Sequence, residues 1–154
     1  MIIVKDIKES QLLWAEWIIN IGSTFSGSGD YIGAAHKMIK DLYGYNEGVV
    51  LFKPTKAGIR QFRLDTEGAL SYFIGGNSEY PEDHGFALKP WINVRFENAG
   101  FILNDNKALA MGNYFFTDIK GVEMKVEYTI GYFRSEDGSL KINLHHSSLP
   151  YSSE

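Results

Sequence analysis

The chain has 154 residues, of which 44% are hydrophobic and 22% are charged, and its formal net charge at pH 7 is −4. These values are typical of a globular protein, the length favours a single domain over residues 1–154, and basic residues neither dominate nor cluster as they do in nucleic-acid-binding proteins. The absence of cysteine excludes disulfides, thiolate nucleophiles and cysteine-based zinc sites, and fits a cytoplasmic location.

The N-terminal part of the chain is expected to be helical and to make no contact with a membrane. Its opening apolar run is too short for a signal peptide, and no later stretch approaches the ~20 apolar residues of a membrane span. Apolar residues at spacings of three and four predict a first helix that begins at Ser10. A second helix follows, capped by Ser28 or Asp30. A short third helix is capped by Asp65 or Thr66.

Alternating apolar and polar residues predict strands in the second half of the chain. Before them, a short strand is expected at 49–52 and an extended segment at 60–63. The later strands are expected at 91–97, 101–103, 107–117, 122–134 and from 140 onward. Helices followed by a run of antiparallel strands indicate an α+β fold in which the helices cover one face of a strongly curved antiparallel sheet. The mouth of such a cone is a natural ligand pocket.

The last strand starts as a regular alternation and ends in two histidines and two serines. Strict alternation puts the following residues on one face: Leu140, Ile142, Leu144, His146 and Ser148. The other face then carries Lys141, Asn143, His145 and Ser147. Two interpretations stay open. Either the apolar face is core and the other is solvated or in a subunit interface, or one face lines a pocket while the other meets a partner chain.

The histidines do not indicate a metal centre. Catalytic zinc typically needs three protein ligands that converge on one point. His145 and His146 are neighbours on a strand, so their side chains point to opposite faces. His36 lies in a helix and His84 in a loop, and no metal-binding spacing joins them. The chain also shows no convincing carboxylate pair for acid–base catalysis and no glycine-rich phosphate loop.

A series of motifs in a fixed order resembles the iota-class carbonic anhydrases. That class belongs to the NTF2-like (SnoaL-like) superfamily and is similar to the association domain of calcium/calmodulin-dependent protein kinase II. The resemblance covers about residues 30–151. Its motifs are Tyr43–Tyr45, Val50–Thr55, Phe62–Arg63, Gly68–Phe73, Gly85–Trp91, Ala108–Phe116, Val126–Thr129 and Leu144–Tyr151.

The resemblance implies a cone-shaped fold, a homodimer formed through the open face of the sheet, and reversible hydration of carbon dioxide to bicarbonate. In members described as metal-free, a polar pocket holds bicarbonate. Its positions fall here on Thr55, Tyr72, His145 and Ser147. No metal cofactor is expected, although manganese or zinc stays open because other members have been reported to prefer manganese.

The four positions differ in how strongly their own chemistry supports this assignment. Taken alone, Thr55 is typical of a turn, and Tyr72 is typical of a helix core residue with its hydroxyl at a wet end. His145 and Ser147 share a strand face, as a common pocket requires. His145 is also the group whose unperturbed pKa, about 6.5, suits proton acceptance or shuttling near neutral pH.

Two other functions remain as alternatives. The fold also serves as a non-catalytic association or ligand-binding module, which would need an apolar outer sheet face. That face could be supplied by Ile92, Val94, Phe96, Phe115 and Phe133. SnoaL-like isomerases and hydrolases use the fold too, and they usually carry an Asp/His pair in the cone. No aspartate is obviously placed for such a pair.

Overall fold

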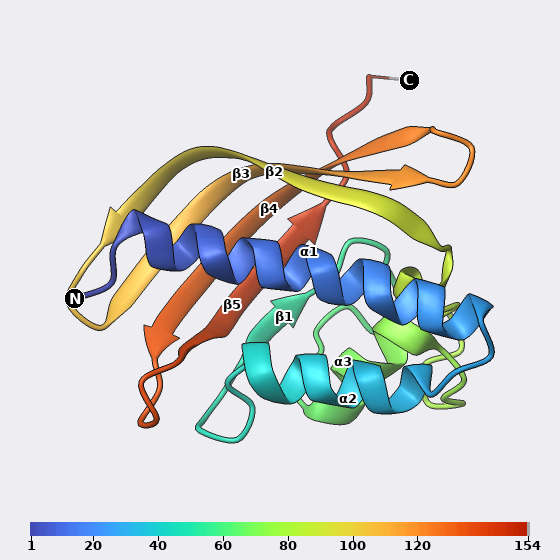
Figure 1. The fold of residues 1–154 in the computed structure, drawn as a ribbon, viewed down its shortest axis with the longest axis horizontal. Helices are drawn as coiled ribbons and strands as arrows, with labels where there is room; N and C mark the ends of the chain where they lie inside the picture. The colour runs from blue at the N-terminus through green and yellow to red at the C-terminus, as the bar shows by residue number, and fades with distance from the viewer. Residues whose placement is uncertain (154) are drawn as a thin grey trace.

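Three α-helices lie on one side of a five-stranded sheet (Figure 1). The structure is a computed structural model, and it describes residues 1–153. The elements in chain order are α1 (Val4–Ser26), α2 (Tyr31–Leu42), β1 (Leu51–Lys53), α3 (Thr66–Ile74), the short 3-10 helix η1 (Phe86–Leu88), β2 (Trp91–Leu103), β3 (Lys107–Asp118), β4 (Glu123–Arg134) and β5 (Leu140–Ser148). This arrangement confirms the α+β class.

The starts of the helices follow side-chain caps. α1 begins at Val4 rather than at Ser10, because the Asp6 carboxylate accepts a hydrogen bond of 2.9 Å from the backbone amide just before the helix. α2 and α3 follow their predicted caps, Asp30 and Asp65. Each of these carboxylates accepts a hydrogen bond from the amide three residues further on, at 2.9 and 2.8 Å.

The strands form one sheet in the order β1-β5-β4-β3-β2. β2 to β5 make the predicted antiparallel meander, but β1 pairs with β5 in parallel, so the sheet is mixed rather than purely antiparallel. Parallel partners need a long connection, and here α3 and the whole meander lie between them. No local pattern in a three-residue strand could have indicated this pairing. The expected extended segment at 60–63 is a loop.

β2 is one unbroken strand, where two were expected, because it absorbs extra residues as bulges. The bulge at Ile92 changes which residues face inward. Trp91 and Val94 are buried, whereas Ile92 is 54% exposed. The ring of Phe96 packs against Trp14 in the core. The expectation that Val94 and Phe96 contribute to an outer apolar face is therefore wrong.

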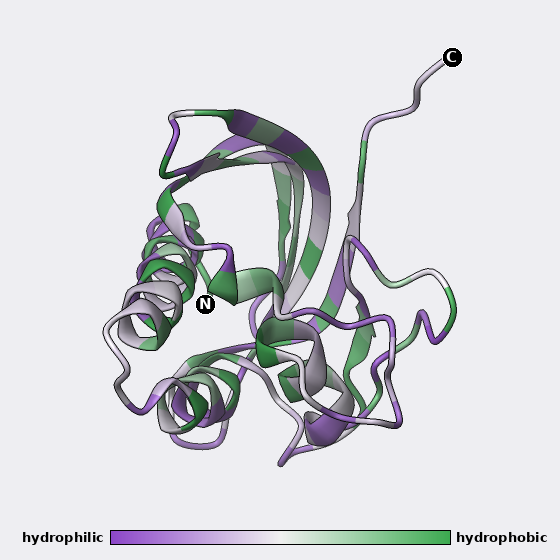
Figure 2. Ribbon diagram, turned by 90° about the vertical axis from the view of Figure 1, so that its right-hand side faces the viewer, coloured by the Kyte–Doolittle hydropathy of each residue, from purple (hydrophilic) through white to green (hydrophobic). Residues whose placement is uncertain are grey.

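The core lies between the helices and the concave face of the sheet, which curves around them (Figure 2). Trp14 of α1 is central to it, with its indole stacked on the ring of Tyr114 at a centroid distance of 5.5 Å. The same core contains His145 and Ser147, each 1% exposed. Polar groups buried this deeply among aromatic rings must find hydrogen-bond partners within the protein.

Candidate active site

A bulge in β5 decides which of its side chains point inward. Ile142 pairs with Tyr132 and Leu144 pairs with Gly131, so Asn143 is an extra residue with no partner on β4. Glycine at 131 permits this close approach, because a Cβ atom there would lie 2.9 Å from the Cβ of Leu144. The bulge interrupts the strict alternation on which the sequence prediction depended.

The bulge places Ile142, His145 and Ser147 on the same, inward face of the strand. Each is 1% exposed, while His146 is exposed. The pocket face that the resemblance implied is thus the buried one. The two histidines point to opposite faces, as predicted, and they cannot share a metal ion.

The loop after β1 and helix α3 supply the other two predicted residues. The Oγ1 atom of Thr55 lies 2.6 Å from the Oγ atom of Ser147. The hydroxyl of Tyr72 accepts a hydrogen bond of 3.2 Å from the backbone amide of Lys56. Thr55, Tyr72, His145 and Ser147 all line one cavity, so the structure brings the four predicted residues together.

This inner cavity is small and mostly aromatic. Its volume is about 10 Å³, which is room for roughly one water molecule. The residues that line it are Trp14, Phe52, Pro54, Thr55, Tyr72, Phe73, Phe86, Tyr114, His145 and Ser147. None of these carries a carboxylate, so the cavity lacks the Asp/His pair that the isomerase alternative requires.

Tyr114 of β3 belongs to the site and was missed by sequence reasoning. Its hydroxyl lies 2.6 Å from the Oγ atom of Ser147 and 3.0 Å from Nε2 of His145. The sequence did hold a signal, because Tyr114 continues the inward alternation of Ala108 and Ala110 along β3. A tyrosine on a buried strand face usually has a hydrogen-bond partner for its hydroxyl.

The other ring nitrogen of His145 is also occupied. Nδ1 lies 2.8 Å from the hydroxyl of Tyr43, and the indole nitrogen of Trp14 donates to that same hydroxyl at 3.0 Å. Because indole nitrogen can only donate, the Tyr43 oxygen accepts from it and keeps its own hydrogen for Nδ1. Any other arrangement leaves a buried hydroxyl hydrogen without a partner. Neutral His145 therefore carries its hydrogen on Nε2.

This tautomer sets the direction of the remaining hydrogen bonds. His145 donates from Nε2 to Tyr114, Tyr114 donates to Ser147, and Ser147 donates to Thr55. The Thr55 hydroxyl hydrogen is then left for Tyr72 beside it or for a ligand in the cavity. In either case, the Thr55–Tyr72 pair keeps at least one hydroxyl hydrogen available to a ligand.

Burial keeps the histidine and the tyrosines of this hydrogen-bond network neutral. It lowers the pKa of His145 to about 3, with a smaller contribution from His146. The Phe52 ring stacks on the imidazole at 4.8 Å, which illustrates how little solvent reaches it. Burial also raises the pKa values of Tyr72 and Tyr114 above their usual range. The expected role of His145 as a proton acceptor near neutral pH therefore finds no support in its surroundings.

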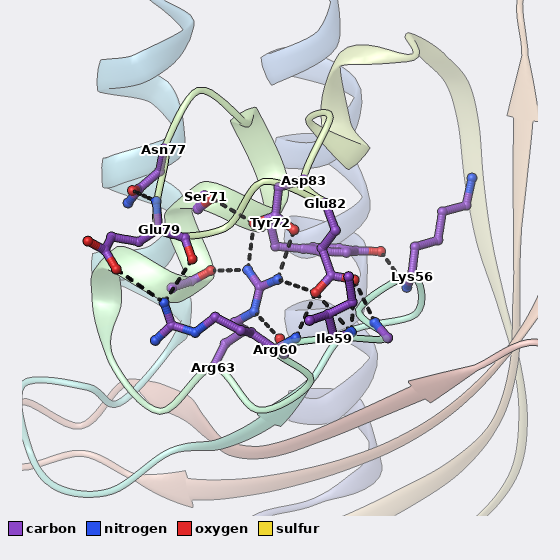
Figure 3. Close-up of polar contacts among 12 residues, drawn as sticks. Lys56, Ile59, Arg60, Arg63, Ser71, Tyr72, Asn77, Glu79, Glu82 and Asp83 are labelled. Atoms are coloured by element: carbon purple, nitrogen blue, oxygen red, sulfur yellow. Dashed lines mark hydrogen bonds and ion pairs between the residues drawn. The ribbon is translucent and has the colours of Figure 1, made fainter.

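A buried arginine ties the loop that follows Lys56 to α3 and to Asp83 (Figure 3). Arg63 is fully buried and donates two hydrogen bonds to Asp83, at 2.6 and 2.8 Å. The hydroxyl of Ser71 donates to the same carboxylate at 2.6 Å. Arg63 also donates to the carbonyl oxygen of Gly68 in α3. The residue next to Ser71 is Tyr72, so this cluster fixes the helix turn that presents the site tyrosine.

Glu82 fastens the same loop from the other side. Its carboxylate accepts hydrogen bonds of 2.7–3.1 Å from three successive backbone amides, at residues 58–60. These amides, that of Gly58 most of all, hold the pKa of the Glu82 carboxyl below its usual range. The segment after Thr55 is thus tied to the loop that leads into η1.

Two features are absent from residues 1–153. No group of three or more His, Cys, Asp or Glu side chains is placed to hold a metal ion. No helix in this part of the chain combines the length and the apolar character that crossing a membrane requires.

Comparison of the chain with known proteins shows which family it belongs to. The sequence model of a family described as metal-independent carbonic anhydrase matches residues 5–149, so the match includes α1. A metal-independent carbonic anhydrase of Nostoc sp. is 41% identical over 97% of this chain and 77% of the relative. The crystal structure of a cyanobacterial iota-carbonic anhydrase complexed with bicarbonate has a TM-score of 0.95 and 39% identity, covering 99% of this chain and 94% of that one. An NTF2-like protein of unknown function from Pseudomonas putida has a TM-score of 0.59 and 13% identity over 97% and 88% of the two chains, and it shares the fold alone.

Proposed function

Because the chain belongs to the metal-independent carbonic anhydrase family, we propose that its inner cavity is the place where carbon dioxide and bicarbonate interconvert. The function of the chain is the reversible hydration of carbon dioxide, which yields bicarbonate and a proton. The observation that carries the assignment to this cavity is the convergence on it of Thr55, Tyr72, His145 and Ser147. The bicarbonate bound to the cyanobacterial relative supports a small anion as the ligand.

The hydroxyl groups are suited to stabilise the charge that develops on bicarbonate. Thr55 and Tyr72 stand at the end of the hydrogen-bond chain, with a donor hydrogen left for a ligand. Ser147 is fixed between Tyr114 and Thr55 by two hydrogen bonds of 2.6 Å. Donors fixed in advance in a site that excludes water stabilise a forming oxyanion more than mobile donors do. We assign Thr55 and Tyr72 to donating hydrogen bonds to bicarbonate. Ser147, whose own hydrogen goes to Thr55, holds that donor in place and can accept from the attacking water.

His145 acts, in this proposal, by positioning Tyr114 and through it Ser147. An imidazole whose pKa is about 3 does not take up a second proton at neutral pH. The proton that hydration releases therefore leaves to water or buffer. Oriented water is a weaker nucleophile than a zinc-bound hydroxide, so we expect slower hydration than in zinc carbonic anhydrases.

Stopped-flow measurement of carbon dioxide hydration on chelator-treated protein tests this function. We expect Thr55→Val to lower kcat/KM by about 10²-fold, the typical effect of losing one oxyanion donor. Ser147→Ala should have a similar effect, because it removes the hydroxyl that holds Thr55 in place. Ser148→Ala is the matched control, because Ser148 bonds to Glu127 outside the cavity at 3.0 Å and should leave the rate unchanged.

The outcomes that oppose the proposal are distinct. No rate above buffer would refute the function, and a loss of activity on chelation would refute independence from metal. Equal, small effects of all three substitutions would mean that the reaction does not take place in this cavity.

We also propose that the protein works as a homodimer in the cytoplasm. The cysteine-free composition suits a reducing compartment. The outer face of the sheet carries exposed apolar side chains that a second copy could cover. They include Ile92, Ile102, Leu109 and Met111, at 54%, 61%, 43% and 58% exposure.

A further inference from the structure

A second, larger pocket lies directly outside the inner cavity. Its volume is about 260 Å³, and it opens between η1, the loop 77–85 and Lys56. The two spaces have two wall residues in common, Tyr72 and Phe86. None of the three other cavities described for residues 1–153 shares a lining residue with the inner one.

The shared wall is a stacked aromatic pair. The rings of Tyr72 and Phe86 lie 5.5 Å apart at an interplanar angle of 18°. Tyr72 is 5% exposed, and its hydroxyl is held by the amide of Lys56. Phe86 is only partly buried, and its ring packs against the core, including an edge-to-face contact with Phe116 at 5.0 Å.

In this wall the ring of Phe86, unlike that of Tyr72, has no hydrogen bond to hold it. Its backbone is fixed, because its carbonyl oxygen accepts a hydrogen bond of 2.8 Å from the indole of Trp91. A change of rotamer at this ring would not require η1 itself to move. Bicarbonate has four heavy atoms and needs more space than one water, so some wall of the inner cavity must yield for it to enter.

The outer pocket has the charge to attract an anion. Its two carboxylates already accept hydrogen bonds within the protein. Glu82 accepts from three backbone amides, and Asp83 accepts from Arg63. Its two lysines, Lys56 and Lys89, form no ion pair within residues 1–153. The Lys56 side chain extends away from the arginine cluster (Figure 3). The unpaired charge in the pocket is thus positive.

We propose that the outer pocket is an antechamber that binds bicarbonate through Lys56 and Lys89, and that Phe86 is the gate between it and the inner cavity. The proposal rests on the proposed function and adds the path by which the anion reaches and leaves the site. Gating steps of this kind often limit turnover when the chemistry is enclosed.

The gate is tested with Phe86→Ala. We expect bicarbonate exchange, followed by ¹³C NMR line shape, to become faster by at least about tenfold, which corresponds to about 1.4 kcal/mol off the barrier. Phe101→Ala is the matched control, because Phe101 is also partly buried against the core but lines neither space. Equal exchange rates in folded wild type and Phe86→Ala, as judged by circular dichroism, would overturn the gate.

The antechamber is tested with Lys56→Gln/Lys89→Gln. We expect the bicarbonate association rate to fall at least about threefold at low salt, and its salt dependence to flatten. The control pair is Lys107→Gln/Lys125→Gln, two exposed lysines that line neither space. Identical rates in both double variants would overturn the antechamber. Wild-type protein that neither hydrates carbon dioxide nor binds bicarbonate would instead refute the proposed function, and the antechamber with it.

Discussion

His145 shows how a single residue changes its role with its partners. In sequence it is the one candidate with a pKa suited to proton transfer, and the resemblance places it in the site. In the structure, Tyr43 and Tyr114 occupy both ring nitrogens, and burial lowers its pKa to about 3. The four predicted site residues could be found from motifs. Tyr43 and Tyr114 were not assigned to the site, because their hydrogen bonds to His145 join residues 102 and 31 positions apart, and no local pattern shows which distant residues meet.

The buried imidazole should make stability depend on pH. The folded pKa of about 3 is below the unfolded value of about 6.5, so the unfolded state binds the proton first. The contribution of His145 to the free energy of unfolding is therefore complete above pH 6.5. It falls as the pH drops from there toward 3, by up to about 1.4 kcal/mol per pH unit. Urea unfolding at pH 7.5, 6 and 5 measures this slope.

The matched variants for that slope are His145→Gln and His36→Gln. His36 is exposed on α2, so its variant should keep the slope, whereas His145→Gln should reduce it. If His145→Gln does not fold, ¹⁵N NMR of the wild type decides. An imidazole of His145 that becomes charged above pH 5 would contradict the prediction.

At the scale of elements, bulges explain most differences between the predicted and observed strands. Periodicity located every long strand, because alternation is a local property of the chain. It could not locate the extra residues at Ile92 and Asn143, which invert the face of everything that follows in the strand. The parallel edge strand β1 is likewise set by packing between distant segments.

Gly131→Ala tests whether the β5 bulge needs a residue without a Cβ atom. The added Cβ would approach that of Leu144 to 2.9 Å, so we expect a loss of about 1–3 kcal/mol in the free energy of unfolding and a lower hydration rate. Gly100→Ala is the control, since nothing lies within 4 Å of its added Cβ. Equal stability of the two variants would show that the bulge tolerates a side chain.

The arginine cluster gives a second prediction at this scale. Asp83→Asn removes the hydrogen-bonded charge partner of the fully buried Arg63 and leaves it only the Glu82 carboxylate, 3.9 Å away. We therefore expect a loss of about 3 kcal/mol in the free energy of unfolding, measured with urea. Glu79→Gln removes a partner from the exposed pair with Arg60 and should cost at most about 1 kcal/mol. A similar, small effect of both substitutions would mean that the cluster does not hold the loops.

At the scale of the whole molecule, one aromatic core joins α1 to every long strand. The α+β class and the curved sheet follow from the order of predicted elements, and the family resemblance implies the same cone-shaped fold. The small size of the inner cavity could not be predicted, because it depends on how ten side chains from six parts of the chain pack together. We propose that this shared core makes the chain a single domain.

The homodimer proposal is tested at the same scale. Sedimentation should give twice the mass of one chain for the wild type, and half of that for Leu109→Glu/Met111→Glu, which places charge on the outer sheet face. Leu12→Glu, at a position 60% exposed on α1, should leave the mass unchanged. A wild type that sediments as one chain would refute the dimer.

The direction of the hydrogen-bond chain has an electrical consequence. Going from Trp14 through His145 to Thr55, each side chain donates a hydrogen bond to the next one, and none donates backwards. Aligned bond dipoles polarise one another, and together they put the positive end of a fixed dipole at the cavity. A neutral set of side chains can therefore present a standing electric field to bicarbonate, with no ion at the site to supply it.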